Sequence, residues 1–341
     1  MTRVAGGSIE ALLALLTPAL ASATADRVAS PQREAILASL NGVLGDYLAA
    51  SNNPLATAMT LRRDGKALAL ERTALRVQLP DAGPRLLVLL HGLCMNDLQW
   101  QRQGHDHGAA LARELGVTAV YLRYNSGLHV SINGHALAQR LERLLQAWPV
   151  PIERLLLLGH SMGGLLARSA LHSGAQAGLR WPARVTDLVC LGTPHHGAPL
   201  ERAGNWVDIL LGATPYAAPF ARLGKLRSAG ITDLRHGNLV DEDWVGRDRF
   251  ARGADRRQPV PLPDKLRCFT LAATTGTQSG DLKDRLLGDG LVPLDSALGR
   301  HKDPARTLAF AEERQWIGYG MNHLELLSRP EVFAQLRHWL R

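Results

Sequence analysis

The residues with the clearest chemical meaning are a serine and the glycines around it. The stretch Gly159-His160-Ser161-Met162-Gly163 matches the pattern G-x-S-x-G, with an apolar run before it and an apolar helical pattern after it. In such a turn between a strand and a helix, a strained backbone lifts the serine hydroxyl off the sheet. Because Ser161 also begins the helix, the positive end of the helix dipole favours an oxyanion there. The pattern predicts a nucleophilic Ser161, the alternative being a plain structural turn.

A serine hydroxyl needs a base to remove its proton and an acid to orient that base. Where such a turn carries the nucleophile, the acid and then the histidine follow it along the chain. His301, His323 and His338 are the histidines that follow both Ser161 and the insertion expected at about 194–265. His301 lies in a charged loop and His338 in an amphipathic terminal pattern, whereas His323 follows the strand-like QWIGYG. We expect His323 to be the base; a structural role in supporting the terminal helix is the alternative.

The acid is expected after the apolar run CFTLAA at 268–273 and before His323. Asp289 stands in the segment GDGLVP, whose glycines permit a tight loop and whose apolar residues anchor it to the core. Asp281 and Asp284 lie in the charged stretch GDLKDR instead. Asp289 is therefore the predicted acid, and Asp295 is the alternative.

An oxyanion hole needs two backbone N–H groups, one from the residue after the nucleophile and one from the loop after an early strand. Met162 supplies the first. The second is expected from Leu93, because His91-Gly92 ends the run LLVLL and the glycine gives freedom to aim the next N–H group. The alternative is that His91-Gly92 only ends a strand. Cys94, which follows, is expected to be an inert buried thiol.

Short apolar runs separated by longer helical patterns must position these residues. Runs that are apolar on both faces and alternate with helices are typical of a parallel sheet covered on both sides. The sequence therefore predicts the α/β class. The runs lie at 86–90, 119–124, 155–159, 185–192 and 268–273.

The N-terminal part has a different pattern. Residues 33–50 have apolar positions at helical spacing, and the polar residues and proline after them end the pattern. A hairpin is expected from Met59–Leu61 and Ala69–Val77 around the turn Asp64-Gly65. We therefore predict an N-terminal helical extension with leading strands over 1–75 and a catalytic domain over 76–341.

An insertion of the catalytic domain is predicted at about 194–265, where helix-like apolar pieces occur without an obvious strand. It leaves the carboxyl end of a strand, where active sites of open α/β sheets lie. We expect a helical cap, the alternative being a surface elaboration without a catalytic role. Its apolar pieces at 206–211 and 215–223 favour a hydrophobic substrate.

Composition narrows the class of protein. The chain has 341 residues, 46% of them hydrophobic and 21% charged, and no uninterrupted apolar run reaches the about 18 residues of a transmembrane helix. The net charge of +8 comes from scattered arginines without basic runs, so nucleic-acid binding is not expected, although contact with an anionic membrane surface stays open. Three widely spaced cysteines indicate neither a disulfide framework nor a zinc site. They favour the cytoplasm, with secretion through the segment 11–25 as the alternative.

Taken together, the segments resemble the α/β-hydrolase superfamily and, within it, bacterial lipase-like and esterase-like members. Similar segments also occur in the glycosylphosphatidylinositol deacylase-like group. The resemblance implies an α/β-hydrolase fold and hydrolysis of carboxylic esters through an acyl-enzyme. Extracellular triglyceride digestion is less expected, because no clear signal peptide, disulfide or calcium site is present. The segments that carry this resemblance are HGLCMND at 91–97, YNSGLHVSINGHALA at 124–138, GHSMGGLLARSAL at 159–171, LGTPHHGAPLERAGN at 191–205, GDGLVP at 288–293 and NHLELL at 322–327.

The predicted function is that of a serine carboxylester hydrolase, lipase-like or esterase-like, acting on apolar acyl esters through acyl-Ser161. An acyltransferase, a thioesterase or a polyester depolymerase with the same triad is the main alternative, and a catalytically idle binding protein is a further one. This chemistry requires no cofactor and no metal. The expected partner is a small-molecule or lipid ester, and the oligomeric state does not follow from the sequence.

Overall fold

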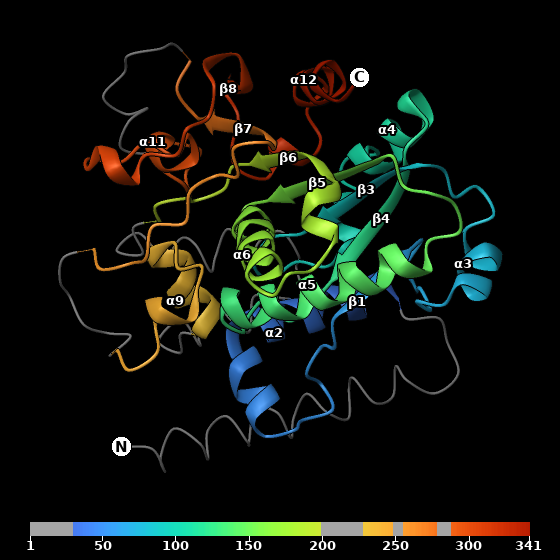
Figure 1. Ribbon diagram of the computed structural model, residues 1–341. Helices are drawn as coiled ribbons and strands as arrows, with labels where there is room; N and C mark the ends of the chain where they lie inside the picture. The colour runs from blue at the N-terminus through green and yellow to red at the C-terminus, as the bar shows by residue number, and fades with distance from the viewer. Residues whose placement is uncertain (1–29, 199–227, 248–254, 278–287) are drawn as a thin grey trace.

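The computed structural model describes residues 30–198, 228–247, 255–277 and 288–341. Within these ranges the strands form one eight-stranded sheet in the order β2-β1-β4-β3-β5-β6-β7-β8 (Figure 1). The six strands from β4 to β8 in this order run parallel, while β1 pairs antiparallel with β2 and β4. The strands are β1 Thr60–Arg63, β2 Lys66–Ala67, β3 Arg85–Leu90, β4 Thr118–Arg123, β5 Arg154–His160, β6 Val185–Leu191, β7 Arg267–Thr274 and β8 Gln315–Tyr319.

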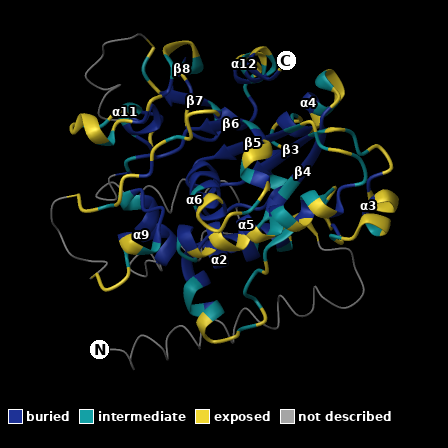
Figure 2. Cartoon of the chain, in the orientation of Figure 1, coloured by how far each residue is buried: buried dark blue, intermediate teal, exposed yellow. Residues whose placement is uncertain are grey.

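The parallel strands β3 to β7 are mostly buried on both faces, as their apolar sequences predict, whereas the edge strand β8 is largely half-buried (Figure 2). Alternate residues of β3 belong to two different hydrophobic clusters, with Leu86 and Val88 in one and Leu87 and Leu89 in the other. The first cluster joins the sheet to α2, α5 and α6, and the second joins it to α4 and α12. The sheet is therefore the middle of three layers.

The helices are bounded as follows. Those of eight or more residues are α2 Pro31–Ala50, α4 His107–Leu115, α5 Val130–Ala147, α6 Met162–Gln176, α9 Ala229–His236 and α12 Pro330–Leu340. Shorter ones are α3 Arg72–Gln78 and α11 Leu294–Ala297, with 3₁₀ turns at Asp97–Trp100, Trp181–Arg184, Asp241–Asp243, Pro304–Arg306, Glu312–Arg314 and Glu325–Leu327. Within the described ranges, no helix is long and apolar enough to cross a membrane.

The predicted α/β-hydrolase fold is confirmed, since strand order, crossovers and helical layers agree with it. The helix expected at 33–50 is α2, and the five apolar runs and QWIGYG are strands β3 to β8. The hairpin prediction was half wrong. Its turn at Asp64-Gly65 joins β1 and β2, but residues 72–78 form the helix α3. Leu75 and Leu79, four residues apart, are buried there, whereas Val77 is exposed, which is a helical pattern of burial.

The flanks of the predicted domains are only partly described. Helix α2 packs beside α9, and Ser228 Oγ at the start of α9 donates to the carbonyl of Gly42 at 2.7 Å. Most of the expected apolar cap pieces, including 206–211 and 215–223, lie outside the described residues, as does the segment 11–25. The division at residue 75 and the cap over 194–265 therefore stay predictions.

Candidate active site

The turn around Ser161 has the strained geometry that its sequence predicts. Strand β5 ends at His160, α6 begins at Met162, and Ser161 between them has φ 55° and ψ −121°. A non-glycine residue in such a region costs about 1–3 kcal/mol and persists only where the surroundings impose it. The surroundings are tight, because a Cβ on Gly163 would overlap the Leu90 carbonyl oxygen at the end of β3.

The Ser161 side chain lies inside this turn. The residue is 1% exposed, and its backbone N–H donates to the carbonyl of Leu191, at the end of β6, at 2.8 Å. Its Oγ is buried and has no hydrogen-bond partner among the described residues. The hydroxyl is thus held next to the carboxyl ends of β3 and β6.

The predicted acid and base are in direct contact. Asp289 Oδ2 lies 2.6 Å from His323 Nδ1, and both side chains are buried. The other carboxylate oxygen accepts from the backbone N–H groups of Leu291 at 2.9 Å and Val292 at 2.8 Å. A carboxylate accepts only, so His323 carries its proton on Nδ1 and presents Nε2 as the possible base.

Glycines shape the loop that carries Asp289. Gly288 and Gly290 have φ of +53° and +92°, values that L-residues with a side chain rarely adopt. The peptide of the loop also closes on the histidine, because the His323 N–H donates to the Asp289 carbonyl at 3.2 Å. The two glycines therefore allow the tight loop, and the hydrogen bond from His323 holds its backbone in place.

The carboxyl end of β6 contacts both the serine and the histidine. Leu191 accepts from the Ser161 N–H group, and a Cβ on the next residue, Gly192, would lie 3.0 Å from His323 ring atoms. His160 reaches the same place from β5, with its ring centroid 4.7 Å from that of His323. Its Nε2 donates to the His323 carbonyl at 3.2 Å. The structure thus gathers Ser161, Asp289 and His323 around one strand end.

The two residues predicted for the oxyanion hole flank the nucleophile in the same region. Met162 is the first residue of α6, and Leu93 directly follows Gly92. A Cβ on Gly92 would lie only 3.1 Å from the Ser161 Cβ, so a side chain at this position would press on the nucleophile. Both Leu93 and Met162 are buried.

Contacts from two other segments fix the loop after β3. Cys94 adopts φ 59°, and its N–H donates to Ser126 Oγ at 3.0 Å. Helix α2 backs the loop so closely that a Cβ on Gly42 would overlap the Cys94 sulfur. Burial raises the pKa of the Cys94 thiol to about 12, so it stays protonated at neutral pH, in keeping with an inert thiol.

Two other histidines near the site are neutral. Burial lowers the pKa of His91, which stacks on Tyr124, to about 3. Burial and the neighbouring His323 hold the pKa of His160 well below its ordinary value. Neither ring brings a positive charge close to the nucleophile, and both serve as neutral packing and hydrogen-bonding groups.

The alternative bases lie elsewhere. His301 Nε2 is 3.5 Å from an Asp255 carboxylate oxygen. His338 is exposed on α12, as expected for a surface histidine. The alternative acid Asp295 is 45% exposed and lies 3.9 Å from the guanidinium of Arg300. The segment with Asp281 and Asp284 is outside the described residues.

Sequence reasoning missed the residues that hold the site rather than form it. Ser126 supports the loop after β3, and Gly192 leaves room for the histidine ring. The signal for both was positional, because each follows the carboxyl end of a parallel strand, where functional groups gather. The described part of the chain contains no group of three or more acidic, cysteine or histidine side chains able to hold a metal ion.

Comparison with known proteins agrees with this fold. Residues 86–253 match the family described as the PGAP1-like alpha/beta domain. The match covers just under half of the chain and, with the strand order, supports the α/β-hydrolase fold. No curated protein sequence matches significantly.

Similar solved structures have modest TM-scores. A mature lipase from Bacillus licheniformis is 21% identical, with a TM-score of 0.45 over 74% of this chain and 91% of that one. An esterase from Pyrococcus furiosus is 12% identical, with a TM-score of 0.44 over 76% of this chain and 81% of that one. A thermophilic esterase from Thermogutta terrifontis is 15% identical, with a TM-score of 0.41 over 76% of this chain and 90% of that one.

Proposed function

We propose that the protein is a serine hydrolase that cleaves carboxylic esters with apolar acyl groups, using Ser161, Asp289 and His323. The observation that carries the proposal is the 2.6 Å contact between Asp289 and His323, beside a serine held in a strained turn. One oxygen of the Asp289 carboxylate accepts from two backbone N–H groups and the other contacts His323, so the carboxylate is held in one orientation. That orientation sets the tautomer of the histidine. An acid and a histidine paired in this way activate a serine hydroxyl that reaches Nε2 of the histidine. Ser161 Oγ has no hydrogen-bond partner among the described residues, and the proposal requires this hydroxyl to turn toward His323.

In the proposed cycle, Ser161 Oγ attacks the ester carbonyl carbon while His323 Nε2 takes the hydroxyl proton. The N–H groups of Leu93 and Met162 stabilise the negative charge on the carbonyl oxygen. When the oxyanion collapses, the bond to the alcohol oxygen breaks, and His323 gives its proton to that oxygen. Water then attacks acyl-Ser161 with His323 again as base, and the acid leaves.

The fold also accounts for the direction of the nucleophile. Helix α6 begins directly after Ser161 and is 15 residues long, so its positive end lies under the reacting atoms. The apolar acyl preference rests on the resemblance of GHSMGG and GTPHHG to lipase-like sequences. Transfer of the acyl group to another alcohol or thiol would use the same residues and differ only in the acceptor.

The test is hydrolysis of p-nitrophenyl esters from acetate to palmitate by the wild type and by Ser161→Ala. The variant should lose at least 1,000-fold in kcat, because its nucleophile is gone. Ser173→Ala is a matched control, since Ser173 lies on the same helix and its hydroxyl contacts His135 Nδ1 at 2.6 Å. It should keep full activity.

The outcomes separate the candidate functions. A maximum at long acyl chains supports the lipase-like proposal, and a maximum at short chains supports a general esterase. Activity retained by Ser161→Ala would refute the assignment of the nucleophile. If the wild type does not hydrolyse esters but reacts with a fluorophosphonate and acylates an added alcohol, the protein is a transferase. If it shows neither reaction, the protein is a binding protein.

A further inference from the structure

Arg168 is a buried cation that has no carboxylate partner among the described residues. It lies on α6, seven residues after Ser161 and about 10 Å along the helix axis, and is 5% exposed. Its Nη1 donates to His195 Nδ1 at 3.2 Å and its Nη2 to the Val260 carbonyl at 2.5 Å. Among the described residues no acidic oxygen lies within 4.0 Å of the guanidinium. Burial lowers the pKa of Arg168 to about 10, so it remains charged at neutral pH.

His195, from the segment GTPHHG, adds a second donor. Because Arg168 can only donate, His195 Nδ1 accepts and the ring proton is on Nε2. In the described structure this Nε2 and the Arg168 Nε are both buried and have no hydrogen-bond partner. Buried polar groups in folded proteins are nearly always paired, and an unpaired buried charge is strongly unfavourable. The two N–H donors therefore lack an acceptor.

Both side chains line a cavity of about 190 Å³ between α6 and the segments after β6, α9 and α11. It is smaller than the about 300 Å³ of pockets that hold drug-sized ligands. The exposed residues at its rim, including Gln258, Pro259 and Ala305, leave it open to solvent. The size suits a small ion or one terminal group of a larger molecule.

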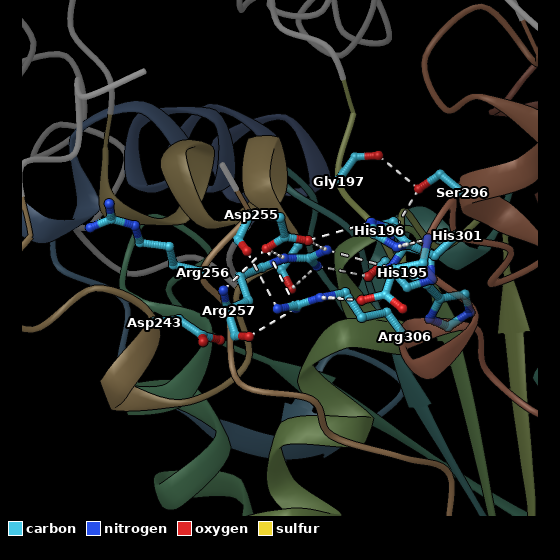
Figure 3. Close-up of polar contacts among 12 residues, drawn as sticks. His195, His196, Gly197, Asp243, Asp255, Arg256, Arg257, Ser296, His301 and Arg306 are labelled. Atoms are coloured by element: carbon cyan, nitrogen blue, oxygen red, sulfur yellow. Dashed lines mark hydrogen bonds and ion pairs between the residues drawn. The ribbon is translucent and has the colours of Figure 1, made fainter. Parts of the chain in front are cut away.

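The carboxylates near this cavity are engaged elsewhere (Figure 3). Asp255 binds Arg257 through both oxygens, at 2.9 and 2.7 Å, and lies 3.6 Å from Arg306. Asp243 accepts from three backbone N–H groups. Arg257 is also occupied by the carbonyls of His195 and Gly237. The described carboxylates near the cavity are thus bound to other groups, and none of them neutralises the charge of Arg168.

We propose that this cavity is a binding site for an oxyanion, such as a phosphate group, with Arg168 and His195 as its two inner donors. The anion would neutralise the buried charge of Arg168 and would accept from Arg168 Nε and His195 Nε2. Both nitrogens are closed to solvent in this structure, so binding requires a small movement of the residues around the cavity that exposes them. The site is separate from the proposed triad. Its ligand is either a free ion or an anionic group on a substrate whose ester reaches Ser161.

The first experiment measures thermal unfolding in sodium phosphate and in sodium chloride of equal ionic strength. Wild type should gain about 2–4 °C in phosphate through binding to the native state, whereas Arg168→Met should gain at least 2 °C less. Because phosphate also stabilises proteins in general, Arg256→Gln is the control. It removes the same charge from an exposed side chain that points away from the cluster in Figure 3, and should respond as wild type does.

The same variants separate this site from a purely structural role for Arg168. If the guanidinium only braces Val260 and His195, Arg168→Met should be less stable than wild type by the same amount in both salts, and the proposal is overturned. Titration calorimetry with inorganic phosphate gives an independent reading. Binding should weaken at least tenfold in Arg168→Met and in His195→Phe, and equal binding by all variants would also overturn the proposal.

A kinetic experiment identifies the source of the anion and rests on the proposed hydrolase function. The wild type and Arg168→Met are compared on a neutral acyl ester and on the same acyl ester of glycerol phosphate. A KM raised at least tenfold only for the phosphorylated ester assigns the site to a substrate group. Unchanged KM values together with phosphate binding assign it to a free ion. Failure of all hydrolysis would refute the proposed function but leave the calorimetric and thermal readings of the anion site intact.

Discussion

Replacing Asp289 with asparagine separates orientation of the histidine from its mere presence. The amide oxygen of an asparagine can still accept from the N–H groups of Leu291 and Val292, which now bind Oδ1 at 2.9 and 2.8 Å. The amide NH₂ would then face His323 Nδ1, where the carboxylate now lies 2.6 Å away. Two donors cannot face one another, so the imidazole proton moves to Nε2 and the ring can no longer act as a base toward Ser161.

The expected loss follows from this change of tautomer. A comparable aspartate-to-asparagine change in a serine triad lowers kcat about 10,000-fold, which corresponds to about 5.4 kcal/mol of transition-state stabilisation. The loop itself should hold, because its two backbone contacts and the shape of the side chain are kept. The assay is kcat for a p-nitrophenyl ester, accompanied by thermal unfolding to show that the variant is folded.

Asp295→Asn is the matched control for this experiment. Asp295 is 45% exposed and lies 3.9 Å from Arg300 at the protein surface, where such pairs contribute little. Its activity should stay within about twofold of wild type. A folded Asp289→Asn variant with more than a tenth of wild-type kcat would refute the reasoning, as would a large loss in Asp295→Asn.

Three further predictions concern packing and titration. Gly163→Ala should lower the free energy of unfolding by about 1–3 kcal/mol in urea titrations, because its Cβ meets the Leu90 carbonyl; unchanged stability would contradict the packing. Burial lowers the pKa of His107 from 6.5 to about 4, so the unfolded chain takes up a proton first as the pH falls. The stability that the neutral, buried His107 contributes is present above about pH 6.5 and is lost as the pH falls toward 4. The free energy of unfolding should therefore fall by about 2 kcal/mol less between pH 7 and pH 5 in His107→Gln than in wild type. An equal fall in both proteins would contradict the prediction. Burial raises the pKa of Cys94 and of Cys190 to about 12, so mass spectrometry should find them unmodified by iodoacetamide at pH 7.5 until urea unfolds the protein, and rapid alkylation of the native state would show them to be accessible.

The sequence predicted those parts of the fold that depend on local pattern. The strands β3 to β7 are mostly apolar on both faces, and such runs between helical patterns have few other solutions. Asp289 could be singled out because glycines surround it, and the structure indeed gives both glycines positive φ. The pairing of Asp289 with His323 was predicted from their order along the chain together with the local patterns around each residue.

Other parts depend on contacts between distant segments and could not be read from local sequence. The segment of helix α3 was predicted as part of a strand at Ala69–Val77 because it follows the turn Asp64-Gly65, while the burial of Leu75 and Leu79 decides the outcome. The support of Cys94 by Ser126 joins residues 32 positions apart. The lack of a carboxylate beside Arg168 within the described part of the chain is likewise visible only once α6 and the segment around Val260 are placed together. Localisation and the extent of the cap remain predictions.

The packing of α2 against the loop after β3 has a consequence for the order of folding. Gly42 touches Cys94, and the Gly42 carbonyl accepts from Ser228, 186 residues later in the chain. Contacts between such distant residues close slowly, because a long loop must lose its entropy first. We therefore expect the loop with Leu93 to take its final shape late, once α2 has docked. Recovery of activity during refolding should therefore lag behind recovery of secondary structure.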